Sequence, residues 1–221
     1  KYTALSDLLG QLNLNLYDWE KLYGKEEVEG TPAERFRGVI RRAYEQTGKP
    51  VVVLIDEYDA PLLDSNHLPE LQNELREEMR KFFSPLKAQG EYLRFLFLTG
   101  ISKFSQMSIF SELNNLQNIS MWDEYSAICG ITEQEVHTLQ IDIEQMAQAN
   151  NETYEEACTH LKQQYDGYHF SENSEDIYNP FSLFNAFAQK KYSNFWFSTG
   201  TPTFLIDLLQ ESNFDIRELD D

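Results

Sequence analysis

The chain has 221 residues, 41% of them hydrophobic, which suffices for one large folded domain or for a main domain with a smaller second one. Its 18 Lys and Arg stand against 37 Asp and Glu, and the net charge of −19 argues against binding to nucleic acid or to an anionic membrane. The two cysteines, Cys129 and Cys158, have no metal-ligand spacing. We therefore expect free thiols in a reducing compartment, the cytoplasm.

We expect no outward targeting of this chain. No apolar run is long enough to cross a bilayer, and the first residues lack the pattern of a secretion signal. Because the sequence starts at Lys1 without an initiator Met and ends in an acidic run, we expect a piece of a longer protein.

Two helices are predicted ahead of the first strand. From Tyr2 to Tyr23 apolar residues recur at spacings of three and four, which indicates an amphipathic helix. The run Thr31-Pro32-Ala33-Glu34 is typical of a capping box with proline at the first helical position. The helix that begins there is predicted to end at Gly48.

Residues 51–59, V-V-V-L-I-D-E-Y-D, are the central motif. Five apolar residues, four of them β-branched, predict a strand buried on both faces, and carboxylates follow at its end. An apolar strand that ends in Asp-Glu is the Walker B pattern, in which Asp holds Mg²⁺ on a nucleoside triphosphate and Glu polarises the attacking water. Asp56 and Glu57 occupy these positions. The alternative is a buried strand whose polar end is only solvated.

A second buried strand is predicted at Leu93 to Leu98, after a long helix that begins at Pro69. A strand, a helix and a strand in this order form a right-handed crossover, so the two strands should be parallel neighbours. Thr99 and Ser102 follow the second strand and are expected beside the acidic pair. A hydroxyl at this position can sense the γ-phosphate or orient water.

The second half of the chain is predicted to be mainly helical. A short edge strand is predicted within residues 113–121, and Pro180 is expected at the start of a helix. We expect residues 1–130 to form an α/β core and residues 131–221 to form a small helical, winged-helix-like lid. The helices predicted in this lid are Thr132 to about Ala149, Tyr154 to Gln164, Asn179 to Phe187 and Thr201 to Leu209.

Several chemistries lack their motifs. No G-x-x-x-x-G-K-[ST] phosphate loop occurs in the sequence, and without it the residues shown cannot bind a triphosphate in the usual way. The four histidines are in no zinc-binding arrangement, and no G-x-S-x-G nucleophile motif is present.

The sequence resembles the AAA-ATPase-like proteins, a bacterial family whose members often carry a C-terminal nuclease-like domain of the PD-(D/E)XK type. The resemblance covers nearly the whole chain. It implies a P-loop NTPase-like parallel sheet flanked by helices, incomplete here because the phosphate loop of the family precedes residue 1. The motifs that carry it are T-P-A-E-R-F-R, V-V-V-L-I-D-E-Y-D-A-P-L, Y-L-R-F-L-F-L-T-G-I-S-K-F-S, L-N-N-L-Q-N-I-S, Y-D-G-Y-H-F and Y-N-P-F-S-L.

The resemblance also implies roles for single residues. Asp56 takes the Mg²⁺ position, Glu57 that of the catalytic base, and Thr99 and Ser102 match the sensor region. Pro180 resembles the proline that related signalling ATPases place against adenine, although it also fits as a plain helix-start proline. ATP and Mg²⁺ are thus expected as ligands of the full-length protein, and the residues shown are expected to be inactive alone.

Two functions remain open at this point. The leading interpretation is the truncated core of an ATPase that binds and hydrolyses ATP. The alternative is a non-catalytic regulatory or protein-interaction module that keeps the ATPase fold. A protein partner or a homo-oligomer is compatible with both.

Overall fold

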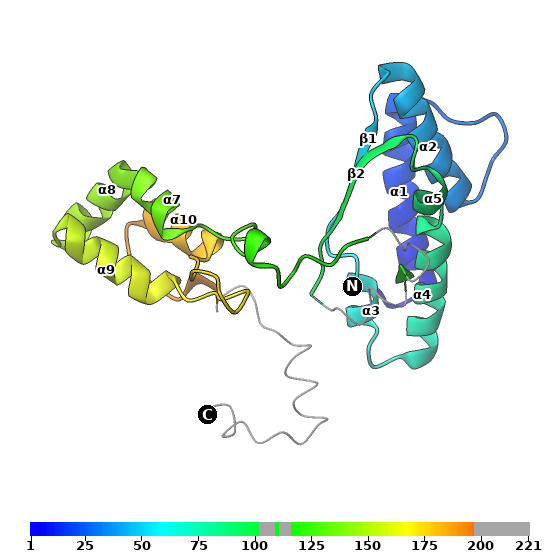
Figure 1. The fold of residues 1–221 in the computed structure, drawn as a ribbon. Coiled ribbons are helices and arrows are strands. Elements are labelled where there is room, and N and C mark those ends of the chain that lie inside the picture. Colours follow the sequence, from blue (N-terminus) through cyan, green and yellow to red (C-terminus); the bar gives the residue numbers. More distant parts are fainter. Residues whose placement is uncertain (102–108, 111–115, 197–221) are drawn as a thin grey trace. The chain divides into compact units, whose positions relative to one another are not determined.

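The computed structural model describes residues 1–101, 109–110 and 116–196, and the chain divides into two compact units, Lys1–Leu116 and Gln117–Asp221 (Figure 1). We refer to them as unit 1 and unit 2 and describe each by itself. The predicted division into an ATPase core of residues 1–130 and a lid of residues 131–221 stays a prediction. Among the described residues no helix is both long and apolar enough to span a membrane.

Unit 1 is an α/β arrangement built from helices and two strands. Its first helix ends at Tyr23, and its second helix begins and ends as the sequence predicts. The Thr31 hydroxyl accepts from the Glu34 N–H and the Glu34 carboxylate accepts from the Thr31 N–H, while Gly48 takes the left-handed conformation at φ 64°. The elements in order are α1 (Leu5–Tyr23), α2 (Pro32–Thr47), β1 (Val51–Ile55), α3 (Ala60–Asp64), α4 (Pro69–Phe83), α5 (Pro85–Ala88) and β2 (Leu93–Leu98).

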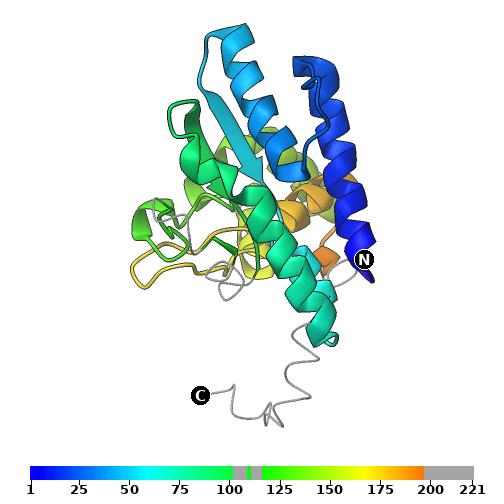
Figure 2. The same cartoon turned by 90° about the vertical axis from the view of Figure 1, so that its right-hand side faces the viewer.

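The two strands pair in parallel, as predicted, with Val53 opposite Leu96 and Ile55 opposite Leu98. In Figure 2 the light-blue arrow of β1 follows directly after α2. One face of this sheet packs on α1, α2 and α4, where Leu16, Ile40 and Leu75 are among the fully buried side chains. The core of unit 1 therefore lies between these three helices and one face of the sheet.

The other face of the sheet is open, so the prediction that both strands are buried on both faces is wrong for the described residues. Val52, Leu54 and Phe95 are 51%, 70% and 54% exposed, and Phe97 stacks on Phe95 with ring centroids 5.9 Å apart. The reason is that α1, α2 and α4 all pack on the face of Val53 and Leu96. A strand with apolar residues at successive positions is expected to be covered on both faces of its sheet. In the described part of the chain, helices cover only one of these faces.

Short helices interrupt the path between β1 and β2, and one predicted strand is not found among the described residues. Residues 60–64 form the short helix α3. Pro85 begins α5 and separates it from α4, because its ring removes a backbone donor. The predicted strand at residues 113–121 is absent from residues 116–121, and its first residues lie outside the described part.

Unit 2 is mostly helical around its own apolar core. Ile143, Met146, Leu161 and Leu183 are fully buried there. Its described elements are two 3₁₀ turns, Asp123–Tyr125 and His137–Leu139, and the helices α7 (Glu133–Val136), α8 (Gln140–Asn150), α9 (Tyr154–Tyr165) and α10 (Pro180–Gln189). Isolated antiparallel bridges join Ile131 to Tyr178 and Tyr168 to Ile177. A winged-helix lid stays a prediction, and the helix expected at 201–209 lies outside the described residues.

The two faces of β1 give a direct test of this arrangement. Val53→Asp places a carboxylate against the helices, so we expect the free energy of unfolding of residues 1–221 to fall by about 2 kcal/mol or more. Leu54→Asp, one residue further on the open face, should change it by no more than about 0.5 kcal/mol. Urea unfolding measures both variants. Equal losses would contradict the described packing.

Candidate functional site

The candidate site lies where β1 and β2 end at the same edge of the parallel sheet. The Thr99 N–H donates to the Ile55 carbonyl at 2.9 Å, and the Tyr58 N–H donates to the Thr99 carbonyl at 3.1 Å. These two bonds continue the pairing past Leu98, the last residue of β2. The side chains of Asp56 and Thr99, which are 43 positions apart in the sequence, meet as a result.

Glu57 has an unusual backbone at this edge. In a regular parallel ladder the Thr99 carbonyl would accept from Glu57, but it accepts from Tyr58, so Glu57 is an extra residue in the strand. Its φ of 49° lies in the left-handed region, which costs a residue with a Cβ about 1–2 kcal/mol. This conformation turns Glu57 out of the ladder, and its side chain is exposed.

The Asp56 carboxylate is held through one of its two oxygens. Oδ1 accepts from the Glu57 N–H at 3.1 Å and from the Thr99 hydroxyl. The Glu57 N–H also lies 3.4 Å from the Thr99 hydroxyl oxygen, which closes a small ring of polar contacts. Oδ2 has no hydrogen bond to any described residue, and Asp56 is exposed. One oxygen therefore orients the carboxylate while the other stays available to a ligand.

The residues after Glu57 fasten this edge to the core of unit 1. Tyr58 and Asp59 are 7% and 1% exposed, and the Tyr58 ring packs edge-on against Phe110. A Cβ on Gly100 would stand 2.5 Å from the Tyr58 ring and 2.7 Å from Asp59 Oδ1. Thr99 can thus reach Asp56 because the next residue has no side chain.

The start of the chain borders the same edge. The Tyr2 N–H donates to the Asp64 carboxylate at 3.1 Å. Burial raises the pKa of the Tyr2 phenol, and the negative charges of Asp64 and Glu57 raise it further. Tyr2 was not among the sequence-predicted site residues, since nothing in its sequence context marks it as more than an apolar helix neighbour.

The sequence-predicted residues thus fall into three groups. Asp56, Glu57 and Thr99 come together in unit 1. Ser102 lies outside the described residues. Pro180 belongs to unit 2, where it opens α10 behind an Asn179 side chain that accepts from the Ser182 N–H at 2.8 Å. That environment is typical of a helix-start proline, and contact of Pro180 with adenine stays a prediction.

The groups at this edge fit a magnesium ion better than a metal held by protein alone. Among the described residues no set of three or more His, Cys, Asp and Glu side chains could hold a metal. Mg²⁺, however, prefers oxygen ligands and is usually bound through one or two carboxylates together with phosphates and water. Asp56 could supply one such oxygen, and the Thr99 hydroxyl fixes the orientation of its carboxylate.

A mostly apolar cavity of about 760 Å³ runs along β1 and reaches Asp56. Side chains of α1, α2 and α4 line it together with the strand, and Asp56 is its one acidic lining residue among those described. The Asp56 carboxylate therefore lies at the border between the apolar cavity and solvent.

Fold and site together define an α/β protein with an acidic pair and a hydroxyl at the carboxyl ends of parallel strands. A family model described as predicted AAA-ATPase matches residues 1–110, and these residues belong to that AAA-ATPase-like family. No solved structure matches the chain.

A longer relative comes from Azotobacter chroococcum mcd 1 and is named "Uncharacterized protein in vnfD 5'region". The two sequences are 41% identical over 205 residues, which is 93% of this chain and 38% of that protein. The chain thus spans well under half of the relative's length.

Gly100 offers a test of the close approach behind the site. Gly100→Ala forces the new Cβ against Tyr58 and Asp59, and we expect it to lower the free energy of unfolding by about 1–3 kcal/mol. Gly90→Ala is the matched control, because no atom lies within 4 Å of the Cβ position there. If urea unfolding finds the two variants equally stable, the strand ends are not packed as described.

Proposed function

We propose that unit 1 carries the metal and water side of an ATP hydrolysis site, with Asp56 as the Mg²⁺ ligand and Glu57 as the general base. The observation that carries this proposal is the Asp56 carboxylate, oriented through Oδ1 by two donors with Oδ2 left for a ligand. The family of residues 1–110, described as predicted AAA-ATPases, supports the same kind of activity.

The role of Glu57 follows from its exposure and its freedom from ion pairs. Within the described residues its carboxylate forms no salt bridge, so no cation neutralises it. The left-handed backbone points it away from the ladder, on the residue next to the proposed metal ligand. A base in this position takes a proton from a water molecule that attacks the terminal phosphoryl group.

Thr99 is proposed as a positioning residue. Its hydroxyl donates to Asp56 Oδ1, and its backbone joins β2 to both Ile55 and Tyr58. A ligand that pulls on the Asp56 carboxylate therefore acts on the end of β2 as well. This link supports a sensor role for Thr99, whereas the same role for Ser102 rests on the resemblance alone.

Bound Mg²⁺-ATP would supply a phosphoryl group whose charge the metal neutralises as the bond to the leaving group breaks. Residues 1–221 contain no glycine-rich phosphate loop and no lysine in its motif. We infer that the phosphate loop is contributed by polypeptide outside these residues. The relative, of which the alignment covers 38%, is long enough to contain such a segment.

The adjacent acids separate hydrolysis from binding in the full-length protein. Glu57→Gln removes the base but keeps the size of the side chain, so turnover should fall at least about a hundredfold while ATP still binds. Asp56→Ala should weaken Mg²⁺-dependent ATP binding instead. Phosphate release and calorimetry measure the two effects, and Glu74→Gln, an exposed acid on α4, serves as the control.

The turnover measurements also distinguish the ATPase from the alternative, a non-catalytic module. Full turnover in the Glu57→Gln protein would remove Glu57 from the mechanism. Undetectable turnover in the unsubstituted full-length protein, with nucleotide bound, would favour the non-catalytic regulatory or interaction module.

The location of the phosphate loop has its own test. Residues 1–221 alone should bind Mg²⁺-ATP weakly or not at all, because backbone N–H groups of a loop and its lysine provide most of the phosphate contacts. Isothermal titration of these residues with ATP and Mg²⁺ measures this directly. Tight, Mg²⁺-dependent binding would place the phosphate site within the residues shown.

A further inference from the structure

Positive charge is concentrated on one short stretch of α2. Arg35, Arg37, Arg41 and Arg42 are four of the 18 basic residues in a chain with a net charge of −19. Arg35 is bound to Glu20 of α1 through two hydrogen bonds of 2.9 and 2.8 Å. The other three arginines form what we call the basic face of α2.

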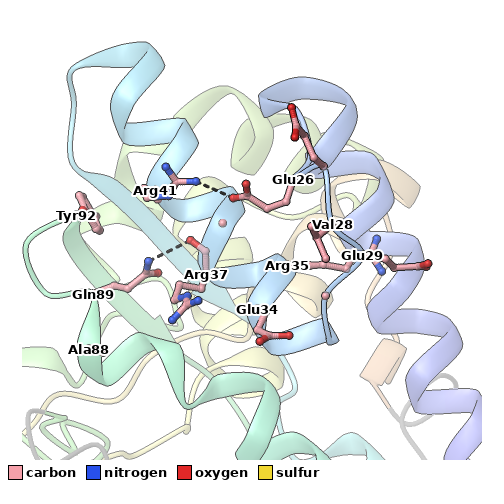
Figure 3. A pocket seen from close by; sticks show the side chains of 13 residues that line it. Glu26, Val28, Glu29, Glu34, Arg35, Arg37, Arg41, Ala88, Gln89 and Tyr92 are labelled. Carbon is pink, nitrogen blue, oxygen red and sulfur yellow. Dashed lines mark hydrogen bonds and ion pairs between the residues drawn. The ribbon is translucent and has the colours of Figure 1, made fainter.

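An acidic loop lies against this basic face. Residues 25–30, K-E-E-V-E-G, connect α1 with α2, and we call them the acidic strap. Glu26 Oε1 accepts from Arg41 at 2.7 Å (Figure 3). It also accepts from Arg42 at 2.6 Å. The hydrogen bond from Arg41 keeps the pKa of the Glu26 carboxyl below its usual range. The strap thus places one carboxylate between two guanidinium groups.

The strap is held by little else. No backbone hydrogen bond joins residues 25–30 to another described residue. Among the side chains of the strap, Glu26 alone forms hydrogen bonds with described residues. Val28 is 81% exposed. Cavities of about 820 and 530 Å³ lie on the two sides of the strap. The pair of Glu26 with Arg41 is exposed on both sides and contributes little to stability, so the strap leaves Arg41 at low cost. The pair with Arg42, whose side chain is 12% exposed, is the stronger hold on the strap.

The basic face offers more donors than the strap uses. The Arg37 guanidinium forms neither a hydrogen bond nor an ion pair with any described residue. Nε and one Nη of Arg42 are buried without an acceptor among the described residues. Gly38 follows Arg37 on α2, and a Cβ at Gly38 would lie 2.7 Å from Arg42 and 3.0 Å from Glu26. A glycine is unfavourable inside a helix, and here it leaves room for a carboxylate at the helix surface.

We propose that the basic face of α2 is a docking site for an acidic segment of another protein, and that the acidic strap occupies it when that segment is absent. The occupant seen in the structure is itself a peptide with glutamates around one aliphatic residue. A partner segment with more carboxylates can pair with Arg37, which the strap leaves without an ion pair among the described residues, as well as with Arg41. A nucleic acid backbone fits less well, because it needs a long basic surface and the rest of this chain is acidic.

The probe for this proposal is the peptide K-E-E-V-E-G, titrated into residues 1–221 and followed by NMR chemical shifts. Glu26→Gln removes the competing carboxylate, and the peptide should then bind about three to ten times more tightly than to the unsubstituted chain. Glu27→Gln removes the same charge from a strap residue that makes no hydrogen bond to described residues, and should leave the affinity unchanged.

A double variant locates the site. Glu26→Gln with Arg41→Ala should lose the gain in affinity, and Arg41 is exposed enough, at 39%, that its loss should leave the circular dichroism spectrum unchanged. The proposal is overturned if Glu26→Gln binds the peptide no better than the unsubstituted chain, or if the double variant keeps the gain. Tighter binding of a short DNA duplex than of the peptide to Glu26→Gln would overturn the choice of partner.

Discussion

The parallel pairing of β1 with β2 is the constraint on which the candidate site depends. Parallel strands end at the same edge of a sheet, and the register that sets Ile55 opposite Leu98 also sets Asp56 beside Thr99. A shift of one residue would exchange the side chains that face the helices, such as Val53, for those of the open face, and would separate Asp56 from Thr99. Packing of α1, α2 and α4 on one sheet face holds this register. The same packing that forms the core therefore also positions the candidate site.

Local signals made much of unit 1 predictable from the sequence. The capping box at Thr31, the glycine at position 48 and the two β-rich runs each determine a boundary through interactions within a few residues. The open face of the sheet could not be predicted, because strand composition does not say which elements cover it. The left-handed Glu57 and the contact of Glu26 with Arg41 depend on tertiary structure, and their residue types carry no local signal for it.

Family membership and geometry contribute different parts of the functional proposal. The match of residues 1–110 with predicted AAA-ATPases supports the kind of activity proposed, but it assigns no atom a task. The contacts of Asp56, Glu57 and Thr99 suggest which atoms face a metal and a water molecule. Ser102 and Pro180 remain predictions, since the first lies outside the described residues and the second belongs to unit 2.

The backbone of Glu57 has a consequence for how this chain responds to selection. At a φ of 49° glycine would relieve a steric cost of about 1 kcal/mol, so glutamate is not the residue that makes this turn most stable. Variants chosen only for heat resistance would drift toward glycine at this position, whereas variants chosen for turnover would keep the carboxylate. Stability and the proposed chemistry therefore pull this one position in opposite directions.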